Sequence, residues 1–432
     1  MTENKKISII SGRLAPLANP SYRFLLSSNT LWWLCMWMEM IVVGWLTLEL
    51  TNSAWMVSLI GFYRAAPLMF IGFFSGPIGD RFGRVRLVRL SQGLNFLVQF
   101  AIVLLLWTDT LSFWHLSVGS FILGIGWAVD FPTRRSLMPD LVGKSRIVDG
   151  VLLDSFLQSI ARLLGPFTAG FLIDAAGPVG CFAMMTVFSG IGLFFTTRIF
   201  EPDAPQFKTP GASPGKQILG GLTYIIGNRL ILAALLITAA MNFLIFPHKV
   251  LQPIFARDIL GQGPVGLGIL GTVPGLGSLL ALLLINRMRR SIGNGWVYCL
   301  GSLVMSTTVI GFSASTNFHL SIALMFLFGV GQSWFGIMQS SIVLLRASDE
   351  MRSRAMGAVA LAIGFGPVGK LTLGAMAEGM GAPLAVGLFG VTAVASVLGV
   401  ATTMPVIWKA GNGEAEMPSE DDIPIQGVAG PT

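Results

Sequence analysis

Charged side chains are scarce in this sequence of 432 residues, where Asp, Glu, Lys and Arg together make up only 11%. A soluble domain carries about 25% charged residues, so this chain cannot cover a water-facing surface of the usual kind. Apolar residues reach 53%, and the 52 glycines fit helices that pack closely in lipid. The composition therefore predicts a polytopic membrane protein. It argues against secreted, disordered and nucleic-acid-binding proteins.

Cysteine and histidine are rare as well, with three residues of each. Cys35, Cys181 and Cys299 lie in apolar stretches without CxxC spacing, so they indicate neither a metal site nor a disulfide framework. The sequence also lacks the Walker loop that binds ATP, the HExxH motif of zinc proteases and the GxSxG motif of serine hydrolases. We therefore expect no enzymatic activity, no metal and no cofactor.

Apolar stretches of about 20 residues, the length of a membrane-spanning helix, recur along the whole chain. They predict an all-α membrane protein with twelve transmembrane helices in two six-helix bundles. The predicted spans are 27–50, 54–76, 87–107, 112–133, 151–173, 178–199, 229–247, 264–285, 295–313, 318–345, 353–376 and 383–407. The bundles would occupy 27–199 and 229–407, joined by a proline-containing cytoplasmic linker at 200–228. The segments 1–26 and 408–432 are predicted to be cytoplasmic, and the second is acidic and predicted to be disordered.

Basic residues alternate along the chain in a way that predicts its orientation. Of the 28 Lys and Arg residues, 23 lie in the terminal segments and in the loops that would share a side with them. The opposite side has only Lys249 and Arg257. Because Lys and Arg collect in cytoplasmic loops, we predict a multi-pass protein of the bacterial inner or plasma membrane with both termini in the cytoplasm. The same rule accounts for the net charge of +7 without a nucleic-acid partner.

Two short patterns in the first half of the chain recur in the second half. The segment 76–84 (GPIGDRFGR) aligns with 282–290 (LLLINRMRR), which places two arginines on arginines but an aspartate on an asparagine. The segment 165–170 (GPFTAG) likewise aligns with 366–369 (GPVG). Two related bundles are typical of transporters whose binding site lies at the interface between the halves. Chance similarity between glycine-rich membrane helices is the alternative.

The segment 76–84 resembles the G-x-x-x-D-R-x-G-R loop signature of the major facilitator superfamily, and it lies between the second and third spans, as in that family. Gly165, Pro166 and Gly170 resemble the helix-kink motif in the fifth span of the family's antiporters, although Ala161 replaces an expected glycine. The resemblance implies two bundles that rock about a central site and expose it alternately to each side of the membrane.

Two further segments, 131–140 and 251–256, are similar to the branch of this superfamily that contains macrolide and siderophore exporters. The resemblance as a whole covers roughly residues 20–407. It implies that the first, fourth, seventh and tenth spans line the central cavity, whereas the third, sixth, ninth and twelfth face the lipid.

The resemblance also implies a gate at the cytoplasmic side. In the family, the Asp of the loop signature caps a helix of the other bundle, and the last Arg pairs with an acidic residue at the end of the fourth span. Asp80 and Arg84 occupy the first two positions, and Asp130 is placed to be the acidic partner. The alternative is a solvated basic loop. The predicted gate residues are Gly76, Asp80, Arg81, Gly83, Arg84 and Asp130.

Ionisable residues inside the predicted spans point to function, since each costs roughly 3 kcal/mol or more at membrane depth. The four such residues are Glu39, Arg64, Arg162 and Lys370. Glu39 is the candidate for proton coupling, because a carboxyl group in apolar surroundings can take up and release a proton near neutral pH. The alternative is a structural ion pair between Glu39 and Arg64 that stays ionised and takes no part in transport.

Aromatic, amide and basic side chains indicate what the cavity binds. The candidate substrate-binding residues are Trp37, Trp127, Arg162, Asn242, Gln332, Trp334, Gln339 and Lys370. Such walls suit a large amphipathic compound, whereas packing or anchoring at the membrane surface is the alternative for each tryptophan. His248 and Lys249, near the predicted outer end of the seventh span, could meet anionic substrates as they leave.

Together these features predict a monomeric secondary transporter in the lipid bilayer, namely an exporter that exchanges protons for amphipathic drugs, siderophores or related metabolites. The antiporter-like motif and Glu39 favour this hypothesis. An uptake permease for an organic anion is the alternative, favoured by Arg64, Arg162 and Lys370. A transport-inactive membrane sensor is a third hypothesis, and the lack of any predicted folded domain outside the membrane argues against it.

Overall fold

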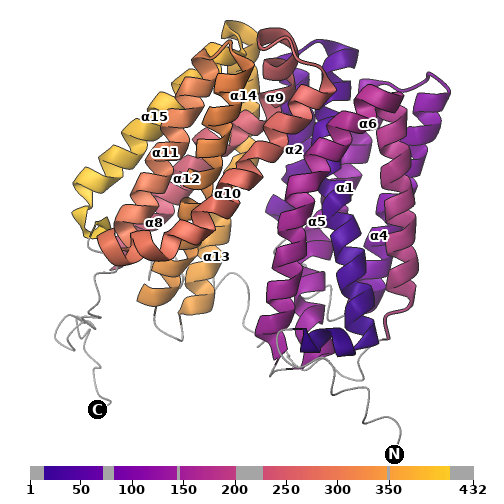
Figure 1. Ribbon diagram of the computed structural model, residues 1–432, viewed down its shortest axis with the longest axis horizontal. Coiled ribbons are helices and arrows are strands. Elements are labelled where there is room, and N and C mark those ends of the chain that lie inside the picture. Colours follow the sequence, from indigo (N-terminus) through magenta and orange to yellow (C-terminus); the bar gives the residue numbers. More distant parts are fainter. Residues whose placement is uncertain (1–13, 72–81, 144–145, 201–226, 348–350, 409–432) are drawn as a thin grey trace, which may run out of the picture.

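The computed structural model describes residues 14–71, 82–143, 146–200, 227–347 and 351–408, and every regular element in these ranges is helical (Figure 1). The first bundle consists of α1 (Pro20–Thr51), α2 (Ala54–Ile71), α4 (Arg84–Trp107), α5 (Phe113–Val142) and α6 (Ile147–Thr197). The second contains α8 (Arg229–Ala240), α10 (Pro264–Ile292), α11 (Asn294–Ala314), α12 (Phe318–Arg346), α13 (Arg352–Ile363), α14 (Gly366–Met380) and α15 (Ala382–Thr403). The predicted all-α fold of two bundles is confirmed.

Ten of the described helices are long and apolar enough to cross a membrane. One of them, α6, has 51 residues and is about 77 Å long at 1.5 Å per residue, far more than the ~30 Å hydrocarbon core of a bilayer. Its path breaks at Gly177, where φ is 68° and ψ is 178°, so α6 supplies two crossings. Helix α2 supplies one more with 18 described residues. The structure is therefore consistent with the predicted twelve crossings.

The ends of two helices differ from the predicted spans in ways that matter for the site. Helix α1 begins at Pro20 rather than at residue 27, because the Asn19 side chain accepts a hydrogen bond from the Tyr22 backbone nitrogen at 3.3 Å and proline is favoured in a first turn. Helix α5 continues to Val142 instead of ending at residue 133. Most of the predicted linker and tail, at 201–226 and 409–432, lies outside the described residues.

The seventh span runs from Arg229 to Ile259 and is irregular in its second half. After α8 come a π-helical turn at Met241–Ile245, a 3-10 turn at Phe246–Leu251, the short α9 (Gln252–Ile254) and a second π-helical turn at Phe255–Ile259. Pro247 and Pro253 interrupt the α-helical hydrogen bonds here because they lack a backbone N–H. The span therefore extends well beyond its predicted end at residue 247, and Phe246 and Lys249 face a cavity described below.

The two bundles pack closely at one end and diverge at the other (Figure 1). At the packed end, Gly170 on α6 meets Gly268 on α10 so closely that a Cβ atom on Gly170 would lie 2.5 Å from the Pro264 carbonyl oxygen. A side chain at Gly374 on α14 would likewise collide with Ser58 on α2. The bundles diverge at the end where α1 begins and α15 ends (Figure 1), which is the end predicted to face the cytoplasm.

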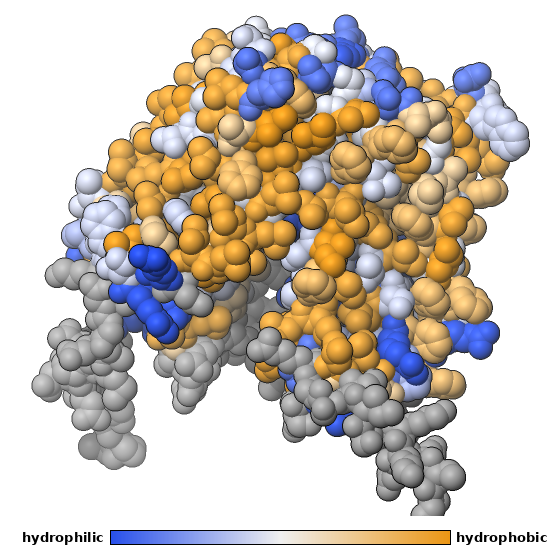
Figure 2. Space-filling view, viewed as in Figure 1, coloured by the Kyte–Doolittle hydropathy of each residue, from blue (hydrophilic) through white to orange (hydrophobic). Residues whose placement is uncertain are grey.

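The surface of the molecule matches a membrane environment. Apolar residues cover most of the face in Figure 2, and hydrophilic residues gather toward its two ends. Large apolar side chains such as Phe100, Phe171 and Leu283 are exposed on the outside of the helices. Soluble monomers rarely expose contiguous apolar patches of more than a few hundred Å², so this surface indicates helices that face lipid.

Candidate functional site

Two cavities between the helices contain most of the predicted site residues that the structure describes. The first, here called the interface cavity, has a volume of about 420 Å³ and lies between α1, α2 and α5 of the first bundle and residues 246–250 and α14 of the second. The second, here called the amide cavity, has a volume of about 370 Å³ and lies among α6, α10, α12 and the irregular part of the seventh span. Phe246 lines both cavities, so the two are neighbours.

Glu39 and Arg64 form an ion pair in the wall of the interface cavity. The Arg64 Nε atom donates to Glu39 Oε1 at 2.8 Å, and Nη2 donates to Oε2 at 3.2 Å. The Glu39 side chain is 8% exposed and that of Arg64 is 21% exposed. The Arg64 guanidinium also lies 5.6 Å from the ring centroid of Trp127. The structure thus contains the ion pair that the sequence offered as an alternative, whereas proton coupling stays a prediction.

Arg162 lies on α6 in the wall of the amide cavity. Its guanidinium is stacked over the Trp37 ring at 5.2 Å from the centroid. The Arg162 Nε atom is buried and has no hydrogen-bond partner among the described residues. Because Trp37 also lines the interface cavity, this pair separates the two cavities.

Lys249 and Lys370 bring two more positive charges to the interface cavity. The Lys249 Nζ atom donates to Gln332 Oε1 at 3.3 Å and lies 5.5 Å from the Phe246 ring centroid. The Lys370 Nζ atom donates to the Gly61 carbonyl oxygen at 3.1 Å, across the bundle interface. Lys249 therefore lines the cavity between the bundles, whereas the sequence placed it near the outer end of the seventh span.

His248, the neighbour of Lys249, does not line either cavity. Its ring is 1% exposed, Nδ1 lies 2.6 Å from the Ile245 carbonyl oxygen, and its edge packs on Phe328 with ring centroids 4.8 Å apart. The 3-10 turn therefore directs the His248 side chain into the helical core in this conformation, away from any exit for substrates.

The predicted amide residues do lie in one cavity. Asn242, Gln332 and Gln339 line the amide cavity together. The Asn242 Nδ2 atom donates to the Thr238 carbonyl oxygen at 2.9 Å, and Gln339 Nε2 donates to Thr238 Oγ1 at 3.1 Å. These bonds hold both amides in fixed orientations toward the cavity.

Of the three candidate tryptophans, Trp37 and Trp127 line the interface cavity. Trp334 lines neither cavity and is buried in the hydrophobic core of the second bundle, close to Gly301. The structure therefore gives no support to the prediction that Trp334 binds substrate, which stays a prediction. The helical period turns this ring toward α11, whereas Gln332 on the same helix faces the amide cavity.

The cytoplasmic gate is only partly visible, because Gly76, Asp80 and Arg81 lie outside the described residues. Gly83 precedes α4 with a φ of 81°, a conformation that suits glycine. The predicted pair of Arg84 with Asp130 is wrong. Instead, Arg84 Nη1 donates to Asp140 Oδ2 at 2.7 Å.

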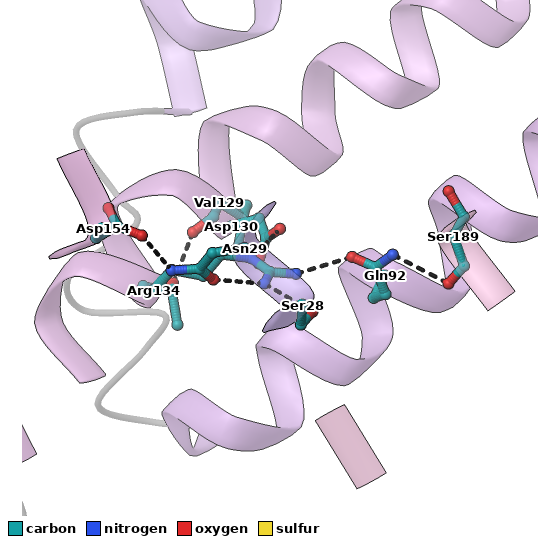
Figure 3. A network of polar contacts seen from close by, with 9 residues as sticks. Ser28, Asn29, Gln92, Val129, Asp130, Arg134, Asp154 and Ser189 are labelled. Atoms are coloured by element: carbon teal, nitrogen blue, oxygen red, sulfur yellow. Dashed lines mark hydrogen bonds and ion pairs between the residues drawn. The ribbon is translucent and has the colours of Figure 1, made fainter. Parts of the chain in front are cut away.

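The partner differs because α5 is longer than predicted. Asp140 lies near the end of α5, beside the start of α4, whereas Asp130 lies ten residues, or about 15 Å, deeper in the bundle. Asp130 pairs there with Arg134 at 2.7 Å. Figure 3 shows the surrounding network, in which Arg134 also donates to Ser28, Asn29 and Gln92. This network joins α1, α4 and α5 within the first bundle.

The helix-kink motif takes part in the contact between bundles. A Cβ atom on Gly165 would lie 2.5 Å from the Trp37 Cβ atom, so α6 and α1 touch here. Pro166 lies against Gly268 and Gly271 of α10, and Gly170 follows one turn later against Gly268. The small residues of the motif therefore let α6 and α10 pack closely.

Two contacts between bundles at the packed end were not predicted. The Glu378 carboxylate on α14 accepts hydrogen bonds from Ser53 Oγ at 3.0 Å and from the Trp55 backbone nitrogen at 2.9 Å, at the start of α2. Arg257 donates to the Leu48 carbonyl oxygen at 3.4 Å and to the side chain of Asn52, at the end of α1. An acid at a helix N-terminus and a base at a C-terminus are both favoured by the helix dipole. Neither contact could be predicted from the sequence, since Glu378 and Arg257 both fall outside the predicted spans.

The comparisons with known proteins agree with this architecture. The profile of a family described as transmembrane secretion effector matches residues 11–429. The chain is 24% identical to the staphyloferrin A transporter of Staphylococcus aureus over 397 residues, which cover 88% of this chain and 93% of that protein. It is 26% identical over 280 residues to YfiS, an uncharacterised MFS-type transporter of Bacillus subtilis, which covers 61% of this chain and 63% of the relative.

Solved structures show the same fold at low identity. The nucleoside transporter NupG superposes with a TM-score of 0.70 at 13% identity, over 88% of this chain and 98% of the other. A bacterial homologue of the human lysosomal transporter Spinster, solved in an inward-facing and unoccupied conformation, gives a TM-score of 0.68 at 13% identity, over 90% and 97% of the two chains.

Proposed function

Because the chain belongs to the transmembrane secretion effector family of the major facilitator superfamily, we propose that it is a proton-coupled secondary transporter that exports amphipathic small molecules. The observation that carries this proposal is the interface cavity, which lies between two bundles whose described helices pack together at one end and diverge at the other. Rocking of one bundle against the other would close the open end and open the packed end, as alternating access requires. A siderophore-like substrate is in keeping with the similarity to the staphyloferrin A transporter.

Glu39 and Arg64 are the proposed coupling residues. Glu39 is the sole carboxylate among the described residues that line the interface cavity. Exchange requires that proton and substrate compete, and a substrate that donates a hydrogen bond to the Glu39 carboxylate favours its ionised form and so expels a proton. Release of the substrate on the outer side would then let Glu39 take up a proton for the return step.

Everted membrane vesicles test both the direction and the coupling. Respiration acidifies the interior of such vesicles, so an exporter that exchanges protons should accumulate substrate inside, and a protonophore should abolish the accumulation. A panel of amphipathic compounds that includes siderophores should be compared in vesicles with and without the protein. The proposal predicts accumulation of at least one compound that depends on both the protein and the gradient.

An uptake permease for an organic anion is the second candidate, and Lys249 and Lys370 in the interface cavity favour an anionic ligand. The direction of gradient-driven transport across the membrane distinguishes the exporter from the uptake permease. Gradient-driven accumulation in right-side-out vesicles, with none in everted ones, would favour uptake.

We also infer that both termini face the cytoplasm and that a monomer suffices for transport, since one chain contains both bundles and both cavities. Reporter fusions after residues 52, 110, 176, 258, 316 and 380 should all report the outer side of the membrane. A cytoplasmic signal at any of these positions would contradict the orientation.

A further inference from the structure

The charges that line the two cavities do not balance. Four cationic side chains, Arg64, Arg162, Lys249 and Lys370, face one carboxylate, that of Glu39. Arg64 already holds this carboxylate in a two-bond ion pair. Three positive charges therefore remain without a counter-charge among the described lining residues.

The partners of these three cations are neutral. Lys249 donates to the Gln332 amide, and Lys370 donates to the Gly61 carbonyl group. Arg162 lies over the Trp37 ring and has a buried Nε atom without a hydrogen-bond partner among the described residues. Cations inside a membrane protein are costly unless they meet an anion or water. These neutral contacts position the side chains without removing that cost.

The three cations also lie in one region of the protein. Lys249 and Lys370 line the interface cavity, and Arg162 lines the amide cavity beside it. A cluster of like charges is unfavourable in an apolar environment. A ligand with several negative charges would relieve this repulsion, whereas a cationic drug would increase it.

The cations come from both bundles. Arg162 belongs to α6 of the first bundle, whereas Lys249 and Lys370 belong to the second. The Lys249–Gln332 hydrogen bond and the Arg162–Trp37 pair lie between the two cavities, because each joins a residue of one cavity lining to a residue of the other. A ligand that displaces these contacts could reach into both cavities and bridge the bundles.

We propose that the transported substrate is an oligoanion with at least two carboxylate or similar groups, bound by Arg162, Lys249 and Lys370 across the bundle interface. The inference rests on the proposed transport function and adds the chemical class of its substrate. Apolar side chains such as Met36, Val43 and Ile60 would hold the uncharged part of the ligand in the interface cavity. An anionic substrate also fits export, because a membrane potential that is negative inside drives anions outward.

Binding of matched aromatic probes to the purified full-length protein tests this class directly. The probes are benzoate, isophthalate, benzene-1,3,5-tricarboxylate, the neutral trimethyl ester of the last, and benzyltrimethylammonium as a cation. Calorimetry at low ionic strength should show affinity that rises about tenfold or more with each added carboxylate. Equal or tighter binding of the ester or the cation would overturn the proposal. So would the absence of binding of the tricarboxylate to folded protein.

Variants locate the site. Arg162→Gln, Lys249→Gln and Lys370→Gln should each weaken tricarboxylate binding about tenfold, whereas Lys249→Arg should retain most of it because the charge is kept. Arg198→Gln removes an exposed arginine at the end of α6 and should leave binding unchanged. Thermal unfolding of each variant shows whether it is folded. If the Gln variants are folded and bind like the wild type, the assignment is wrong.

This binding assay needs no gradient, so it separates the inference from the proposed function. Tight tricarboxylate binding without any flux in vesicles would contradict transport but support the oligoanion site. Gradient-driven flux of a neutral or cationic compound, without tricarboxylate binding, would support transport and overturn the oligoanion site.

Discussion

Arg64 on α2 holds Glu39 on α1 through two hydrogen bonds of 2.8 and 3.2 Å in the wall of the interface cavity. The pair joins two helices of the same bundle and leaves part of the Arg64 side chain in contact with the cavity. The ion pair can therefore stabilise the folded protein and also couple proton movement to transport. The first role predicts a change in the thermal unfolding temperature of variants, and the second predicts a change in gradient-driven transport.

Glu39→Gln should lower the stability of the protein, because Arg64 would lose its counter-charge. We expect a loss of about 2 kcal/mol, less than the ~3–5 kcal/mol for a fully buried pair, since 21% of the Arg64 side chain is exposed. Adding Arg64→Met should restore the thermal unfolding temperature. Glu49→Gln on the same helix is the control, because Glu49 is exposed and accepts a hydrogen bond from Trp45. Equal unfolding temperatures for wild type and Glu39→Gln would contradict the structural role of the pair.

The partner of Arg84 can be identified by double-mutant cycles. Arg84→Gln combined with Asp140→Asn should show a coupling energy of about 1.5 kcal/mol or more, because the Asp140 side chain is 1% exposed and lies 2.7 Å from Arg84. The matched cycle of Arg84 with Asp130 should give less than about 0.5 kcal/mol, as expected for sites without contact. A larger coupling to Asp130 would contradict the position of α4 against α5.

Glu378 should stabilise the packed end of the molecule. Glu378→Gln weakens its hydrogen bonds to Ser53 Oγ and the Trp55 backbone nitrogen, so the population with this end open should rise about fivefold, the equivalent of about 1 kcal/mol. Distances between spin labels at residues 50 and 380, both exposed, would report the change. Asp109→Asn in an exposed loop serves as the control. An unchanged distance distribution in Glu378→Gln would show that the carboxylate does not hold the bundles together.

Gly170→Ala should favour the conformation in which the packed end is open, because the added methyl group would collide with α10. The added Cβ atom would lie 2.5 Å from the Pro264 carbonyl oxygen, and overpacking of this kind costs about 1–3 kcal/mol. Gly275→Ala in the same helix contact is the matched control, because its Cβ atom would meet Leu163 at an ordinary 3.6 Å. The same two spin labels should report opening at the packed end in the first variant only. Opening in both variants, or in neither, would contradict the described packing of α6 on α10.

The twelve crossings, the two bundles and the superfamily could be predicted from the sequence because they depend on long apolar stretches and a loop motif. Glu39 and Arg64 could also be identified from the sequence, because each is an ionisable residue inside a predicted apolar span. Their pairing could be offered as an alternative but not decided, because it depends on how α1 and α2 rotate against each other.

Contacts that depend on where a helix ends could not be predicted. Hydropathy does not point to Asp140, because α5 runs past its apolar stretch, where hydropathy no longer marks the helix. The position of Lys249 cannot be predicted, because the π-helical and 3-10 turns of the seventh span shift every later residue. The orientation of Trp334 cannot be predicted either, because an aromatic residue on a cavity-lining span can face either way.

Gradient-driven transport by Glu39→Gln in proteoliposomes tests the central claim most directly, with a substrate found in the vesicle panel. Glutamine can neither take up nor release a proton, so any binding of substrate by the variant, and any exchange of substrate across the membrane, should no longer depend on competition with a proton at this position. Uphill movement driven by a pH gradient should disappear. A well-folded Glu39→Gln protein with unaltered uphill transport would contradict the account.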